Sequence, residues 1–95
     1  FKYHQLIGPV YGDVLPSPQM FFTVACEDIS AGGIAFYLDQ APDFQKVVIA
    51  LGKPPTLAYF AADVVRYSKK QFGEKTMYLV GCRFTKRIPS SDIEG

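Results

Sequence analysis

Six residues in the first half of the chain, Asp28 to Gly33 with the sequence DISAGG, combine the groups that a turn needs to hold a small polar ligand. The Asp28 carboxylate accepts hydrogen bonds, and the Ser30 hydroxyl can donate or accept one. Gly32 and Gly33 can adopt positive φ angles and let a ligand come close to the backbone amides. Such a turn can bind a phosphate or the edge of a base, although Asp, Ser and Gly are also the ordinary residues of β-turns.

The sequence offers little for catalysis or for metal binding. His4 is the single histidine, so metal or acid–base chemistry has no second histidine to support it. Ser30 does not lie in a G-x-S-x-G elbow, and the two glycines of the turn fit neither a P-loop nor a dinucleotide fingerprint. Cys26 and Cys82 are too few for a zinc site and alternate with apolar neighbours, which predicts buried core thiols. We therefore expect a binding module that is not an enzyme and has no metal or cofactor.

Length and composition favour one small domain. The chain has 95 residues, of which 48% are hydrophobic and 15% aromatic, enough for a core without compulsory disulfides. Ten basic and nine acidic residues give a formal charge of +1, too balanced for a domain dedicated to nucleic acid polymers. The apolar runs are far shorter than the roughly 20 residues that span a bilayer. These features predict a soluble, cytoplasmic protein without membrane insertion.

Two-residue alternation of apolar and polar side chains, interrupted by Gly and Pro, predicts an all-β domain. The expected strands cover residues 3–11, 19–27, 34–39, 45–51, 57–70 and 77–85. The fifth is long enough to bend, and its alanine-rich start would also suit a short helix. The expected core faces carry Met20, Phe22, Val24 and Cys26 in the second strand, Ile34, Phe36 and Leu38 in the third, Ala58, Phe60, Ala62 and Val64 in the fifth, and Tyr78, Val80, Cys82 and Phe84 in the last.

So many short strands would leave open edges unless the sheet closes on itself, so we expect a small six-stranded antiparallel β-barrel. It should occupy residues 1–88, with residues 89–95 as a frayed C-terminal tail or linker. The basic cluster of Lys69, Lys70 and Lys75 flanks the expected hairpin tip between the last two strands. Lysines at such an edge discourage aggregation of strand on strand.

The arrangement Asp28-x-Ser30-x-x-Gly33 between two strands resembles the [DN]-x-S-x-x-G signature of PilZ domains, bacterial receptor modules for cyclic di-GMP. Residues 22–36, FTVACEDISAGGIAF, look like the second strand, the motif and the third strand of that family. Residues 78–84, YLVGCRF, look like its last barrel strand. The resemblance covers nearly the whole expected barrel and implies the PilZ-like, split-barrel type of fold.

The second signature of the family is an R-x-x-x-R pair at or before the first strand, whose guanidinium groups bind phosphates and guanine edges. In this chain no arginine precedes Arg66. By position, the second arginine of the pair would fall near Tyr3 and the first would lie before Phe1. Lys2 and His4 are the cationic residues nearby.

Carried onto this chain, the resemblance implies that the Asp28 and Ser30 side chains contact guanine and that the backbone at the two glycines approaches the ligand. Arg83 can add a guanidinium group against a phosphate or a purine face, or be an ordinary exposed side chain. Tyr3 can stack on a purine, or simply cover the end of the barrel. The candidate binding residues are Asp28, Ser30, Gly32, Gly33, Arg83, Lys2 and Tyr3.

Two functions follow from these expectations. The first is a PilZ-like signalling module that binds cyclic di-GMP and acts on a fused or separate effector protein. The alternative is a degenerate PilZ-like barrel that works as a protein-interaction adaptor without nucleotide, through exposed Tyr37, Tyr59 and Tyr67, since tyrosine is enriched in interfaces. A barrel that binds single-stranded nucleic acid would need a basic groove, which the charge of +1 disfavours.

Overall fold

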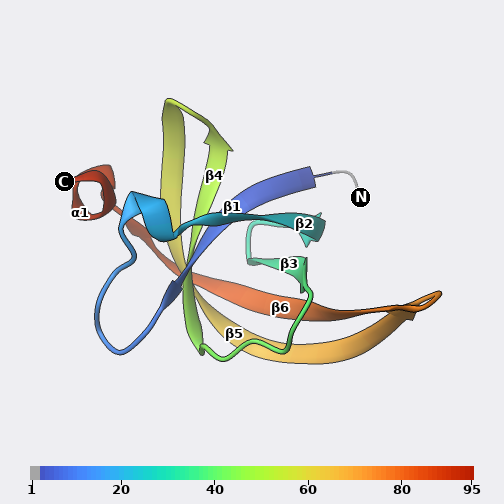
Figure 1. Ribbon diagram of the computed structural model, residues 1–95. Helices are drawn as coiled ribbons and strands as arrows, with labels where there is room; N and C mark the ends of the chain where they lie inside the picture. The colour runs from blue at the N-terminus through green and yellow to red at the C-terminus, as the bar shows by residue number, and fades with distance from the viewer. Residues whose placement is uncertain (1–2) are drawn as a thin grey trace.

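A computed structural model describes residues 3–95 and shows a closed barrel with the strand order β1-β2-β3-β6-β5-β4 (Figure 1). Every neighbouring pair of strands is antiparallel. The predicted six-stranded antiparallel barrel is confirmed, and the fifth segment is a strand and not a helix. The strands are β1 (Tyr3–Val10), β2 (Phe22–Ile29), β3 (Gly33–Leu38), β4 (Lys46–Lys53), β5 (Thr56–Phe72) and β6 (Lys75–Ile88).

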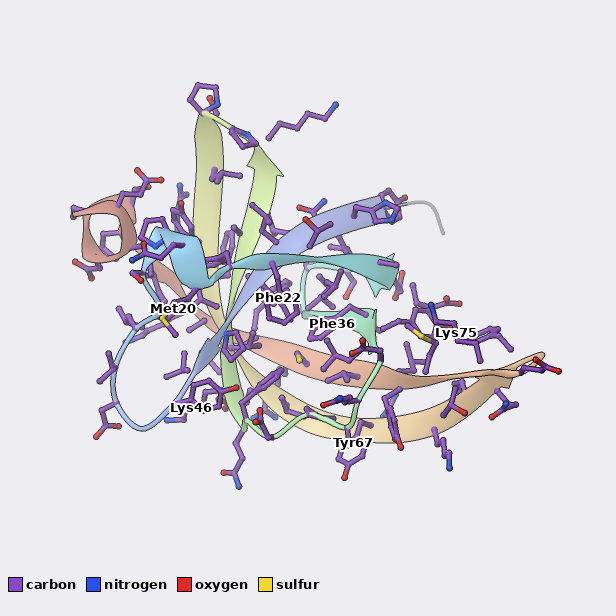
Figure 2. The ribbon with its side chains drawn as sticks, in the orientation of Figure 1. Met20, Phe22, Phe36, Lys46, Tyr67 and Lys75 are labelled. Atoms are coloured by element: carbon purple, nitrogen blue, oxygen red, sulfur yellow. The ribbon has the colours of Figure 1, made fainter. Side chains whose placement is uncertain are left out.

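Alternate residues of each strand fill the barrel, as the period-two pattern predicts. Phe36 on β3 is completely buried and lies inside it (Figure 2). Cys26 on β2 and Cys82 on β6 are buried free thiols in the same core, which confirms their predicted place. Burial, with the Asp63 carboxylate as a smaller cause, raises the pKa of Cys82 to about 12. This thiol therefore stays protonated at physiological pH and packs as a small apolar side chain.

A second apolar cluster covers the outside of β4 and includes the C-terminal helix. Val47 and Ile49 face the interior, whereas Val48 and Ala50 face outward and are equally buried. Their cover comes from the helix α1 (Ser90–Glu94), whose Ile93 is 5% exposed, and from residues near the short 3₁₀ turn η1 (Pro18–Met20). The expectation of a frayed end is therefore wrong for residues 90–94, because the outer face of β4 offers an apolar surface on which they pack.

The predicted core face of the second strand is correct for Val24 and Cys26 but wrong for Met20 and Phe22. The side chains of Met20 and Phe22 are 48% and 42% exposed. Met20 belongs to η1, which precedes the strand and lies outside the barrel wall (Figure 2). Phe22 is the first residue of β2. The alternation in the sequence therefore continues through Met20, which lies outside the sheet, and through Phe22, which pairs with Ile7 at the very end of β2.

The hairpin of β5 and β6 is longer than the barrel needs, and Figure 1 shows its tip reaching away from the other strands. Irregularities in the pairing lie between Ala61 and Ala62 and between Val64 and Arg66. Such β-bulges bend strands, which agrees with the prediction that the fifth strand bends. Among residues 3–95, neither helical segment is long and apolar enough to cross a membrane.

The helix α1 carries a contact that should make stability depend on alkaline pH. The Tyr59 hydroxyl donates a hydrogen bond of 2.6 Å to Oε2 of Glu94. This bond, with burial as a second cause, raises the pKa of Tyr59 to about 12 from its ordinary value of 10.0. The folded protein thus holds the phenolic proton more tightly than the unfolded chain, so the stabilisation is complete below pH 10 and is lost as the pH rises toward 12.

We expect Tyr59→Phe to flatten this alkaline loss of stability. The measurement is the urea midpoint of unfolding as a function of pH, compared with Tyr67→Phe, which removes a hydroxyl from the exposed hairpin. Parallel curves for Tyr59→Phe and the unchanged protein would contradict the role given to the contact between Tyr59 and Glu94.

Candidate functional site

The turn between β2 and β3 is closed by backbone hydrogen bonds. The Ser30 amide donates to the Gly33 carbonyl oxygen at 2.9 Å, which makes the tight reversal expected from the DISAGG sequence. The Phe84 amide on β6 donates to the Gly32 carbonyl oxygen at 3.0 Å. The turn is therefore fixed both within itself and against the neighbouring strand.

Gly33 is required for close approach of two backbones. A Cβ atom at this position would overlap the carbonyl oxygen of Cys82 on β6, whereas one at Gly32 would meet nothing within 4 Å. Neither residue has a positive φ; the positive values belong to glycines elsewhere in residues 3–95. The expectation that these glycines serve a left-handed turn is thus wrong. Gly33 is instead needed because the Cys82 carbonyl oxygen leaves no space for a side chain.

A β-bulge in β2 turns the Asp28 side chain to the outside of the barrel. Cys26 pairs with Phe36, and both face the core. The next pair is Asp28 with Ala35, so Glu27 is an extra residue on β2. Strict alternation from Cys26 would point Asp28 inward, but the inserted residue reverses the parity. The carboxylate therefore lies on the outer surface, where it is exposed.

A second bulge does the same for Arg66 on β5. Val64 pairs with the core residue Cys82 and Arg66 pairs with the next residue, Gly81, which leaves Val65 as the extra residue. Without the bulge, regular pairing through Val65 would give Arg66 the inward parity of Val64. A Cβ atom at Gly81 would lie 3.7 Å from Cγ and 3.9 Å from Nε of Arg66. The arginine side chain accordingly lies across the backbone of Gly81.

The two bulges bring Asp28 and Arg66 into one row across the outer wall. The pairs run from Asp28 to Ala35, from Ala35 to Gly81 and from Gly81 to Arg66. Adjacent strands lie about 4.8 Å apart, so the ends of the row are roughly 14 Å apart at the backbone. A groove of about 290 Å³ follows this row and is lined by Asp28, Ser30, Gly32, Gly33, Ile34, Ala35, Val65, Arg66, Gly81, Cys82 and Arg83.

The groove has a flat floor and walls of opposite chemistry. Its floor consists of small residues, namely Gly33, Ala35 and Gly81, which expose backbone to a ligand. One wall carries the Asp28 carboxylate and the Ser30 hydroxyl, and the other carries Arg66 from β5. Arg83 lies between them on β6, where it pairs with Gly33. The arrangement suits a planar molecule with N–H donors on one edge and with acceptor or anionic groups on the other.

The structure brings five of the seven candidate residues to this groove: Asp28, Ser30, Gly32, Gly33 and Arg83. Tyr3 is 48% exposed on β1, where it pairs with Cys26, and does not line the groove. Lys2 lies outside the described residues. Sequence reasoning missed Arg66, because the bulge that turns it outward has no marker in the sequence apart from the neighbouring valines of DVVR.

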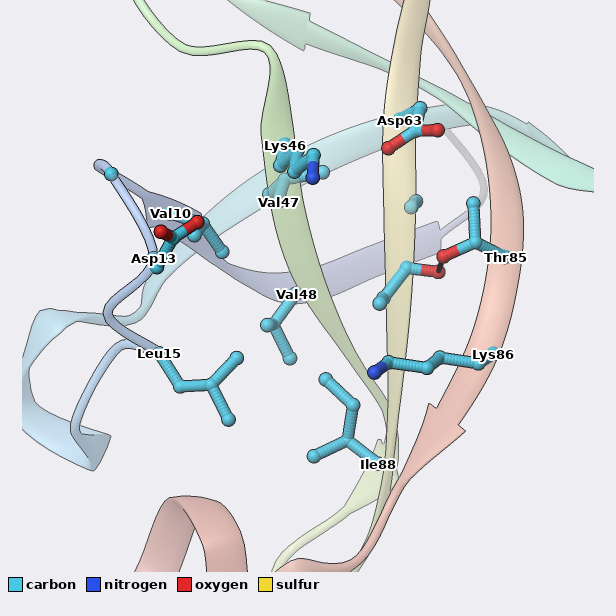
Figure 3. Close-up of a pocket in the computed structure, with 13 residues that line it drawn as sticks. Val10, Asp13, Leu15, Lys46, Val47, Val48, Asp63, Thr85, Lys86 and Ile88 are labelled. Atoms are coloured by element: carbon cyan, nitrogen blue, oxygen red, sulfur yellow. Dashed lines mark hydrogen bonds between the residues drawn. The ribbon is translucent and has the colours of Figure 1, made fainter.

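Two other hollows lie nearby and have different chemistry. One, of about 420 Å³, contains Leu51, Phe60 and Phe84, and the Arg87 guanidinium lies 5.9 Å from the Phe60 ring centroid. The other, of about 230 Å³, opens over Val48 on the outer wall (Figure 3). Its two lysines and two aspartates balance, and the strand register sets Lys46 beside Asp63. Neither hollow combines a carboxylate wall with an arginine wall.

Two of the three tyrosines proposed as adaptor contacts are buried. Tyr37 and Tyr59 are 7% and 4% exposed, whereas Tyr67 is 51% exposed. The Tyr37 ring packs against Phe72, and its hydroxyl donates a hydrogen bond to Glu27. Tyr59 lies in the second apolar cluster. The expectation that all three form an exposed contact surface is wrong for Tyr37 and Tyr59, because neighbouring segments cover the outer wall at those points.

A family model described as PilZ domain matches residues 9–94. The matched part includes the turn, both bulges and the helix α1. No curated protein and no solved structure matches the chain significantly.

Substituting alanine for each of the two glycines should show whether Gly33 is needed for the close approach of β3 to β6 or only for the turn. Gly33→Ala forces a methyl group into the Cys82 carbonyl, so we expect the free energy of unfolding to fall by about 1–3 kcal/mol, the usual cost of overpacking. Gly32→Ala meets open space and should stay within about 0.5 kcal/mol of the unchanged protein. Urea unfolding measures both, and equal effects would show that the approach of β3 to β6 does not constrain this position.

Proposed function

The chain belongs to the PilZ domain family, a family of cyclic di-GMP-binding modules, and on this premise we propose that it is a signalling module that binds cyclic di-GMP in the groove between Asp28 and Arg66. The observation that carries the proposal is the pair of bulges, which aim a carboxylate and a guanidinium group at the same flat floor from two separate strands. A purely structural turn would need neither. The fold, the family and the chemistry of the groove support the same ligand.

The groove fits guanine in particular. The Watson–Crick edge of guanine presents two N–H donors, at N1 and N2, which a carboxylate such as that of Asp28 accepts. Adenine presents an acceptor at N1 on that edge, and this lone pair would oppose the carboxylate. On the opposite side guanine has the acceptors N7 and O6, which arginine binds with two parallel hydrogen bonds. The small floor allows the ring to lie flat between these two walls.

Arg66 and Arg83 supply the positive charge that the diester phosphates need. In the family resemblance this task falls to the R-x-x-x-R pair, whose expected positions lie at Tyr3 and before it. Arg66 and Arg83 have the same planar, permanently charged group, and both are exposed and line the groove. In this proposal they hold one phosphate or stack on a purine face, and a bound nucleotide passes the signal to a fused or separate effector protein.

Isothermal titration calorimetry of cyclic di-GMP into the protein tests the proposal. We expect saturable binding and expect cyclic di-AMP to bind more weakly by about tenfold or more, because one base edge has the wrong donor pattern. Asp28→Ala and Arg66→Ala should each weaken cyclic di-GMP binding by about tenfold or more, since each removes a charge-assisted hydrogen bond.

Arg87→Ala is the matched control for Arg66→Ala. It removes the same charge from a side chain that lies outside the groove. Its affinity should stay close to that of the unchanged protein. Failure of the unchanged protein to bind cyclic di-GMP, or equal losses for Arg66→Ala and Arg87→Ala, would overturn the proposed site.

A further inference from the structure

The outer half of the β5–β6 hairpin exposes a long unpaired strand edge. β4 pairs with β5 as far as Asp63, and the Val64 amide donates a last hydrogen bond of 2.8 Å to the Gln45 carbonyl oxygen. Among residues 3–95, the part of β5 from Val65 to Gln71 pairs with β6 alone. Along such a strand alternate residues direct their N–H and C=O groups to the open side. This edge therefore offers a row of backbone donors and acceptors.

Ring contacts and side-chain hydrogen bonds hold this edge in an extended conformation, although all seven of its residues are exposed. The rings of Tyr67 and Tyr78 meet edge to face with centroids 6.2 Å apart, and those of Phe72 and Tyr37 do so at 5.6 Å. At the tip, the Gln71 side chain hydrogen-bonds both the turn and β6. The strand conformation is therefore already formed before any partner arrives, which lowers the entropy that binding must overcome.

The charge of the hairpin is opposite to that of the rest of the chain. Residues 66–75 hold four basic side chains and one acidic side chain, so the remaining residues carry an excess of acidic side chains within the total of +1. The basic residues occupy both faces of the hairpin, because the pairing register sets Lys70 on the face of Arg66 and Lys69 on the other. Tyr67 and Lys75 mark this hairpin in Figure 2.

We propose that the open edge of β5 from Val65 to Gln71 binds an extended acidic segment of a partner protein, which adds to the sheet as a further strand. Backbone pairing supplies the main attraction, and acidic side chains of the added strand lie beside Lys69 and Lys70. A second copy of this chain is a poorer occupant, since its lysines would lie against these lysines. A nucleic acid has charge but no peptide backbone to pair with the row of N–H and C=O groups.

The lysines thus have a selective effect beyond the general protection of an edge. They repel a second copy of the same edge and attract a strand of opposite charge. The same side chains therefore disfavour self-association and favour an acidic partner. Val65 and Arg66 at the inner end of the edge also line the groove, whereas Lys69 and Lys70 do not. The inference does not depend on nucleotide binding.

Selection of peptides displayed from a random library, each about nine residues long, tests the proposal on the whole chain. We expect the enriched peptides to contain Asp and Glu alternating with β-branched residues. The best of them, made synthetically, should slow amide hydrogen exchange in β5 between residues 65 and 71. A version with N-methyl groups on alternate amides keeps its charges but cannot form the ladder, so it should bind at least about tenfold more weakly.

Two charge-reversed proteins complete the test. The double variant Lys69→Glu, Lys70→Glu should bind the selected peptide about tenfold or more weakly. The control variant Lys53→Glu, Lys86→Glu has the same change of net charge elsewhere on the chain and should bind the peptide with nearly unchanged affinity. Enrichment of no acidic peptide, protection of other strands, or equal binding by both charge-reversed proteins would overturn the proposal. Protection of residues 65–71 by concentration-dependent dimers, or by an oligonucleotide in preference to the peptide, would overturn it in favour of that occupant.

Discussion

Two β-bulges decide which side chains reach the outer wall of this barrel between β2 and β5. In a closed sheet the interior is filled by alternate residues, so every side chain is assigned to a face by counting from its neighbours. Glu27 and Val65 each add one to that count. As a result, Asp28 and Arg66 face solvent in register with each other, although three strand boundaries separate them. If either strand paired regularly through its extra residue, Asp28 or Arg66 would point into the apolar core, where ionised groups are strongly disfavoured.

The space between these two charged residues depends on small side chains. Gly33, Ala35 and Gly81 form the floor of the groove, and Gly33 also lets β3 approach β6 more closely than any side chain would permit. A larger residue at Ala35 would fill the gap between the carboxylate and the guanidinium group. Gly81 similarly leaves room for Arg66 to lie along the wall. The groove is thus shallow and open, and its character comes from the residues at its sides.

The sequence predicts the barrel well because the evidence for strands is repeated in each segment. Val24 and Cys26 on β2, like Val80 and Cys82 on β6, alternate in the sequence as they do in the core. The DISAGG turn is equally visible, since its residue types are tied to reversal of the chain. Bulges are different, because an inserted residue needs no particular side chain, and Arg66 could not be assigned to the groove from its neighbours.

The sequence pattern also does not predict which residues on the outside of the barrel are buried. Val48 and Ala50 have the parity of exposed residues, and their burial depends on a five-residue helix at the end of the chain that brings Ile93 to them. Tyr59 is buried for the same reason, whereas its position in the alternation suggests an exposed ring. What covers the outside of a barrel is decided by segments remote in sequence, and period-two patterning has no information about them.

β5 is long enough to belong both to the barrel and to the hairpin that extends beyond it. Its first half pairs with β4 and closes the barrel; its second half continues past β4 and carries most of the positive charge of the hairpin. Arg66 stands at the change from one to the other, immediately after the bulge. A strand matched in length to β4 would end before this arginine, so the groove would lose one wall and the sheet would have no exposed basic edge. The same excess of strand therefore supplies both features, and the bulge at Val65 sets which face each residue beyond it occupies.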